Sequence, residues 1–115
     1  MPSCGRMLAL ALLAASLGGC CGAELIVDTR GEPARVYFRA LRDAAGQPLG
    51  AEAPEILIGE TDGSEAVAWC LPEELRGGRA ALRLEFAEAL PKDLQINLER
   101  DDDTVVRVQP QKRVR

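Results

Sequence analysis

The sequence predicts an all-β fold: a small antiparallel β-sandwich of about seven strands that follows a cleaved N-terminal signal peptide. Apolar and charged residues alternate with a period of two in several short runs, most clearly in Leu-Arg-Leu-Glu-Phe at 82–86. Glycine, proline and aspartate separate these runs, as expected for turns between half-buried strands. The length of the chain fits one domain. Short alternating strands joined by turns are typical of a sandwich.

The elements follow in order along the chain. Strands are expected at 25–27 and 35–41, separated by a Gly-Glu-Pro turn. A loop with two glycines and two prolines occupies 43–55, and strands at 56–58 and 66–71 flank an Asp-Gly turn. Pro72 begins a single helical turn at 72–75, which two glycines end. The last strands are expected at 82–86, 94–100 and 106–108, and the final two, joined by three aspartates, are predicted to form an antiparallel hairpin.

The N-terminus carries a targeting signal. Arg6 precedes an apolar run of 11 residues at 7–17, which ends in Leu17-Gly18-Gly19-Cys20. This ending resembles the lipobox of bacterial lipoproteins, whose cysteine becomes the acylated N-terminus. The resemblance implies lipidation, palmitate included, at Cys20, and a lipid-anchored protein of the bacterial cell envelope. Cys21, rather than Asp, follows that cysteine, which implies the outer membrane, facing the periplasm. The alternative is an ordinary secretory signal cleaved after Ala23.

These features divide the chain into a signal peptide at 1–19, a lipid anchor and short tether at 20–24, a β-sandwich domain at 25–109 and a basic C-terminal tail at 110–115. Because all 18 acidic residues and 13 of the 14 basic residues follow residue 19, the mature chain has a net charge of −5. An acidic chain argues against nucleic acid as a partner. No stretch reaches the roughly 20 apolar residues needed to span a membrane, so the expected membrane partner is reached through the lipid.

The mature region also resembles the PEGA-type β-sandwich modules of bacterial surface proteins. The matching features are a first strand, a Gly31-Glu32-Pro33-Ala34 turn, a Val-rich second strand and a later Gly59-Glu60-Thr61 turn. The tetrapeptide order differs, the loop at 43–55 is extra, and Asp62 stands where that family has proline. The resemblance implies a structural or envelope-associated unit.

Residues suited to catalysis are scarce. The chain has no histidine, and the mature region has a single serine, Ser64, so neither a Ser-His-Asp nor a Cys-His site can form. We therefore expect a protein that is not an enzyme and has no cofactor. Asp101, Asp102 and Asp103 could suggest calcium, but adjacent residues lack the alternate spacing of a calcium loop. We expect a solvated turn there and no metal site.

Two cysteines, Cys21 and Cys70, remain in an oxidising compartment after processing. Alternation places Val67, Trp69 and Leu71 on the core face of their strand and Cys70 on the other face. A Cys21–Cys70 disulfide is one possibility, and a buried free thiol or an intermolecular bond are the alternatives.

The expected function is that of a non-catalytic structural or protein-interaction module. The loop at 43–55, with Asp43, Gln47, Glu52 and Glu55, is the candidate binding surface for an envelope protein or polymer, because ordered loops of that length are uncommon without a use. A tolerated insertion is the alternative reading of the loop. The alternative function is a small-ligand-binding or enzyme-inhibitor lipoprotein of the periplasm, which would need a concave apolar pocket. The sequence leaves the oligomeric state open.

Overall fold

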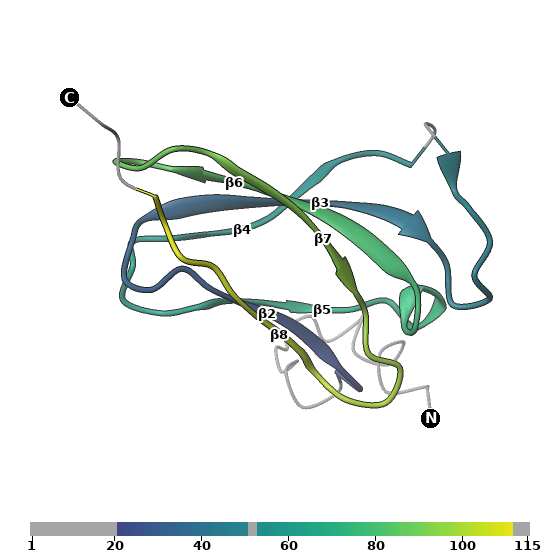
Figure 1. The fold of residues 1–115 in the computed structure, drawn as a ribbon. Coiled ribbons are helices and arrows are strands. Elements are labelled where there is room, and N and C mark those ends of the chain that lie inside the picture. The colour runs from purple at the N-terminus through teal and green to yellow at the C-terminus, as the bar shows by residue number, and fades with distance from the viewer. Residues whose placement is uncertain (1–20, 51–52, 112–115) are drawn as a thin grey trace, which may run out of the picture.

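The computed structural model describes residues 21–50 and 53–111. They form seven β-strands in two sheets and one 3₁₀ turn, η3, and this confirms the expected all-β, sandwich-like fold (Figure 1). Within these residues, no helix is long and apolar enough to cross a membrane. The elements are β2 (Glu24–Asp28), β3 (Ala34–Arg42), β4 (Ile56–Thr61), β5 (Val67–Cys70), η3 (Glu73–Leu75), β6 (Arg79–Phe86), β7 (Lys92–Asn97) and β8 (Thr104–Arg107).

The smaller sheet has the order β5-β2-β8. Its central strand, β2, pairs antiparallel with β5, where Glu24 lies opposite Cys70. On its other side β2 pairs parallel with β8, where Leu25 lies opposite Thr104. One pair of strands in the sandwich is therefore parallel.

The predicted hairpin of the last two strands is wrong. β7 lies at the edge of one sheet and β8 at the edge of the other, and they do not pair. The chain leaves β7 at Leu98, which is buried and donates its backbone N–H to the Gly78 oxygen over 2.9 Å. The Glu99 N–H then donates a hydrogen bond to the Thr104 hydroxyl over 2.8 Å, which closes the turn that carries the chain from one sheet to the other. Alternation continued through 98–100 in the sequence, but it reports only which side chains face inward and not which sheet holds the strand.

The larger sheet has the order β4-β3-β6-β7, with all neighbours antiparallel. β3 and β6 are its two longest strands and form its centre. Inward-facing residues of β3 and β6 meet those of β2 and β5, as alternation predicted. Burying each large apolar side chain contributes about 1.5–3 kcal/mol. The largest fully buried apolar side chains are Leu25, Val27, Val36, Leu71, Leu82 and Leu84.

Trp69 packs in this core rather than on a binding face. Its ring lies 4.8 Å from that of Phe38, centroid to centroid, at an interplanar angle of 50°. Phe38 comes from the larger sheet and Trp69 from the smaller one, and a tilted contact between two aromatic rings is energetically favourable.

The two sides of the sandwich differ. On one side β4 and β5 come close, and a Cβ added at Gly59 would lie 2.6 Å from Val67 Cγ1. On the other side, a groove of about 820 Å³ runs between the edges formed by β7 and β8.

The two ends of the sandwich also differ. At one end, β2 begins, η3 follows β5, and the turn between β7 and β8 passes alongside (Figure 1). At the opposite end, the turn at 29–32 meets the turn after β4: a Cβ added at Gly63, which has a φ of +102°, would lie 2.3 Å from the Gly31 oxygen. The described chain ends at that opposite end, where Leu90 donates to the Gln111 oxygen over 2.9 Å.

Candidate functional site

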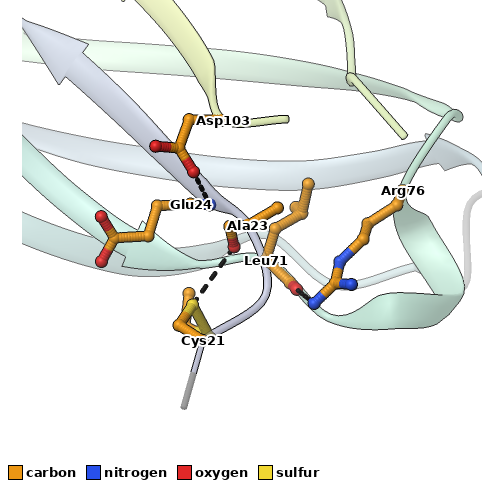
Figure 2. The surroundings of a disulfide bond; sticks show 7 residues. Cys21, Ala23, Glu24, Leu71, Arg76 and Asp103 are labelled. Atoms are coloured by element: carbon orange, nitrogen blue, oxygen red, sulfur yellow. Dashed lines mark hydrogen bonds between the residues drawn. A yellow bond between two sulfur atoms is a disulfide. The ribbon is translucent and has the colours of Figure 1, made fainter. Parts of the chain in front are cut away.

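The expected lipidation residue, Cys20, lies outside the described residues, as does the whole signal peptide at 1–19. The residue after it, Cys21, is joined to Cys70 by a disulfide, and the two Cα atoms are 5.7 Å apart (Figure 2). The structure thus contains the intrachain bridge among the three possibilities that the sequence left open.

The position of Cys70 explains why the bridge can form. Cys70 ends β5 and its side chain is exposed, on the same face as Ala66 and Ala68, while Val67 faces the core. Its Cα partner in the sheet is Glu24, only three residues after Cys21. Pairing of β2 with β5 therefore brings Cys21 within bonding reach of Cys70.

The segment at 21–24, expected to be a tether, is held against the domain. Ala23 is buried, and its carbonyl oxygen accepts a hydrogen bond from the Leu71 N–H over 3.0 Å. The Glu24 N–H donates to an Asp103 carboxylate oxygen over 2.8 Å (Figure 2). Cys21 Sγ lies 3.2 Å from the Ala23 oxygen; a disulfide sulfur has no proton to donate, so this is a contact rather than a hydrogen bond.

Arg76 also contacts this segment. Its Nη2 donates to the Leu71 oxygen over 3.4 Å, and a Cβ added at Gly22 would lie 2.9 Å from both terminal nitrogens (Figure 2). Among the described residues, its Nε is the buried side-chain nitrogen that has no hydrogen-bond partner. The guanidinium therefore lies directly beside the backbone that leads to Cys20.

We call this end of the molecule the tether end and define it as residues 21–24, 71–78 and 98–104. It is acidic: it holds seven carboxylates and two arginines, all of them exposed except Glu24 and Arg76, which are half-buried. The acidic residues are Glu24, Glu73, Glu74, Glu99, Asp101, Asp102 and Asp103, and the basic ones are Arg76 and Arg100.

The candidate binding loop at 43–55 begins at the tether end. Ala44 donates to the Glu74 oxygen over 2.8 Å and accepts from Arg100 over 3.1 Å. The Asp43 carboxylate accepts the N–H groups of Ala45 and Gln47, each over 2.9 Å, so it stabilises the loop itself. The Gln47 side chain is exposed, and Glu52 lies outside the described residues.

Glu55 belongs to a different group of side chains. Arg83 on β6 binds it through two nitrogens, Nη2 at 2.8 Å and Nε at 3.1 Å, and also pairs with Glu85. These hydrogen bonds from Arg83 hold the pKa of Glu55 below its ordinary value and raise that of Arg83. The Arg83 guanidinium also lies 4.2 Å from the centre of the Tyr37 ring. The structure therefore does not bring Asp43 and Glu55 into one site.

Sequence reasoning overlooked Arg83 and Arg76. Alternation placed Arg83 on the outer face, but its partner Glu55 is 28 residues away across a loop. Arg76 follows η3, and nothing in its neighbours signals contact with Gly22.

The groove between β7 and β8 is open to solvent rather than enclosed. Apolar residues such as Ile96 and Val106 line it together with Glu99, Asp102 and Asp103. Among residues 21–50 and 53–111, no group of three or more His, Cys, Asp or Glu side chains is arranged to hold a metal ion.

No known protein family, curated protein or solved structure matches this chain.

Proposed function

We propose that this protein is a lipid-anchored lipoprotein of the bacterial cell envelope, acylated at Cys20, that acts as a non-catalytic structural or protein-interaction module. The observation that carries the proposal is the disulfide that fixes Cys21, the residue directly after Cys20, to the end of β5.

The alternative cleavage, after Ala23, fits the structure less well. It would remove Cys21 and leave Cys70 without its disulfide partner. It would also remove the buried Ala23 and the acceptor of the Leu71 N–H. Losing a native disulfide typically costs a small secreted domain 2–5 kcal/mol. A signal peptidase that cut there would thus weaken the domain that it releases.

Three further features support an interaction module over a ligand-binding protein or an enzyme. The groove between β7 and β8 is open and lined with carboxylates, whereas ligand pockets are enclosed and largely apolar. The chain has no histidine to act as a general base. The resemblance to PEGA-type modules points to the same kind of role. An envelope protein or polymer is the proposed partner, and we place the protein in the outer membrane because Cys21 follows the lipidated residue.

The test is acylation at one cysteine and not at its neighbour. Cells that express the wild type, Cys20→Ser and Cys21→Ser would be labelled with a clickable fatty acid and fractionated, and intact masses would be measured. We expect the wild type and Cys21→Ser to carry lipid and sediment with membranes, and Cys20→Ser to carry none. A wild-type protein that is soluble and unmodified would refute the proposal.

Density-gradient separation of the two membranes tests the location. Co-migration with inner-membrane markers would contradict the outer-membrane assignment.

A further inference from the structure

We infer that the tether end lies directly on the lipid surface and that the turns at 29–32 and 62–65 face away from it. This inference rests on the proposed acylation of Cys20. It concerns which surface of the domain the membrane covers and which surface remains open to a partner.

The first step is the length of free chain. Successive Cα atoms are about 3.8 Å apart, so the Cα of Cys20 lies within that distance of Cys21. Cys21 is itself fixed 5.7 Å from Cys70, Cα to Cα. The acylated residue can therefore be no farther than about 10 Å from the end of β5. Gly22 and Ala23 add no slack, because they are packed against Arg76 and Leu71.

The second step is the size of the domain along β2. The chain takes nine steps from Cys21 to Arg30, with β2 at Glu24–Asp28 between them, and at about 3.3 Å per residue these steps span at most about 30 Å. The turn that contains Gly63 packs against the turn that follows β2, so both lie at this far end. Because the acylated residue stays within about 10 Å of the end of β5, about a third of this span, the domain cannot invert over its anchor.

The third step is the surface that would meet lipid if the domain lay on its side. The outer face of the larger sheet carries ion pairs, between Arg35 and Glu60 and between Arg83 and Glu55. Of the exposed large apolar residues of the edge strand β4, Leu57 lies on this face, opposite Tyr37, whereas Ile56 lies opposite Phe38, which faces the core. Contact through this face would desolvate the ion pairs, whereas end-on contact leaves them in water.

The chemistry of the tether end indicates which lipids it fits. Arg76 lies beside Gly22, so in this orientation its guanidinium would be close to the lipid phosphates. The surrounding carboxylates of Glu73, Glu74 and Asp101–Asp103 are exposed and fit the ammonium groups of zwitterionic headgroups.

This orientation has a consequence for the partner. The loop at 43–55 starts beside Glu74 and Arg100, at the tether end. A protein that contacts the base of this loop must therefore lie at the membrane surface. A partner within the periplasm would instead meet the far end.

The experiment compares two exposed acidic turn residues at opposite ends, Asp102 and Glu65. Each is replaced, one at a time, by a small fluorescent amino acid in the acylated full-length protein. The protein is placed in phosphatidylcholine vesicles that contain a nitroxide-headgroup lipid, which quenches fluorescence only at short range. We expect several-fold stronger quenching at position 102 than at position 65.

A linker variant serves as the matched control. Inserting about 12 Gly/Ser residues between Cys20 and Cys21 gives the anchor a root-mean-square reach of about 19 Å, and quenching at position 102 should fall toward that at position 65. Equal quenching at both positions in the acylated, vesicle-bound protein would overturn the orientation alone. A protein that carries no acyl chain and does not float with vesicles would overturn the proposed function and the orientation with it.

Discussion

Removing the Cys21–Cys70 disulfide should lower the free energy of unfolding by about 4 kcal/mol. The bridge joins residues 49 apart in the sequence. In the chain-entropy model, closing a loop of that length removes about 14 cal/mol/K from the unfolded chain, which is about 4 kcal/mol at 25 °C. Whole domains are stable by only about 5–15 kcal/mol. At about 4–8 °C per kcal/mol for a domain of this size, the melting temperature should fall by about 15–30 °C.

Urea unfolding of the soluble mature chain, with Cys20→Ser, measures this loss. The variants are Cys21→Ser, Cys70→Ser and the double substitution. Each is measured in reductant and compared with the disulfide-bonded chain measured without reductant. All three should lose the same amount, because either change breaks the one bond. The urea dependence should also steepen, because the unfolded chain without the bridge exposes more surface.

A matched control separates the bond from the side-chain change. Ala68→Ser lies on the same exposed face of β5 as Cys70 and should alter stability by less than about 0.5 kcal/mol. A loss below about 1 kcal/mol for the double substitution would refute the reasoning. So would single losses that add up in the double variant, because they would mean that the two sulfurs stabilise the fold by separate contacts.

Leu84→Ala should cost about 2–5 kcal/mol in urea unfolding, because the fully buried side chain leaves a cavity in β6, and a loss under about 1 kcal/mol would mean that the core packing is misassigned. Gly63→Ala should destabilise more than Gly46→Ala: both glycines have positive φ, but only at Gly63 would the Cβ meet a backbone oxygen, and equal losses would show that the two turns do not touch. Arg83 lowers the pKa of Glu55 in the folded state, so the stability this pair contributes is present above the ordinary pKa of 4.5 and is lost as the pH falls through the folded value. Glu55→Gln should therefore flatten the decline in stability between about pH 6 and pH 3, and an unchanged pH profile would contradict the pairing.

The strands and their buried faces were predictable because each depends on local alternation. In β6, every second residue from Ala80 to Phe86 is buried, as the pattern required. The same rule turned Cys70 outward, toward the segment that holds Cys21. The expected loop and the 3₁₀ turn after Pro72 also followed from local turn residues.

The pairing of strands was not predictable to the same degree. β8 shows the same alternation whether it pairs with β7 in a hairpin or lies parallel to β2 in the other sheet. Leu98 is buried at the point where the chain leaves one sheet for the other, and local alternation does not encode that change of sheet. Contacts such as Arg83 with Glu55 depend on where a long loop returns, which residue periodicity does not encode.

The acidic tether end raises an energetic question, because anionic lipids would repel it. At a surface potential of about −30 mV, each elementary charge costs about 0.7 kcal/mol, so a net charge of five costs at most about 3–4 kcal/mol at the surface. Salt reduces this cost within a Debye length of about 8 Å. An acyl anchor contributes about 0.8 kcal/mol for each buried methylene, and two or more chains hold stably. The proposed anchor would therefore dominate attachment, and the carboxylates would affect only how closely the tether end approaches the headgroups. A partner that binds the base of the loop at 43–55 would enter this narrow space, so we expect it to be membrane-bound itself.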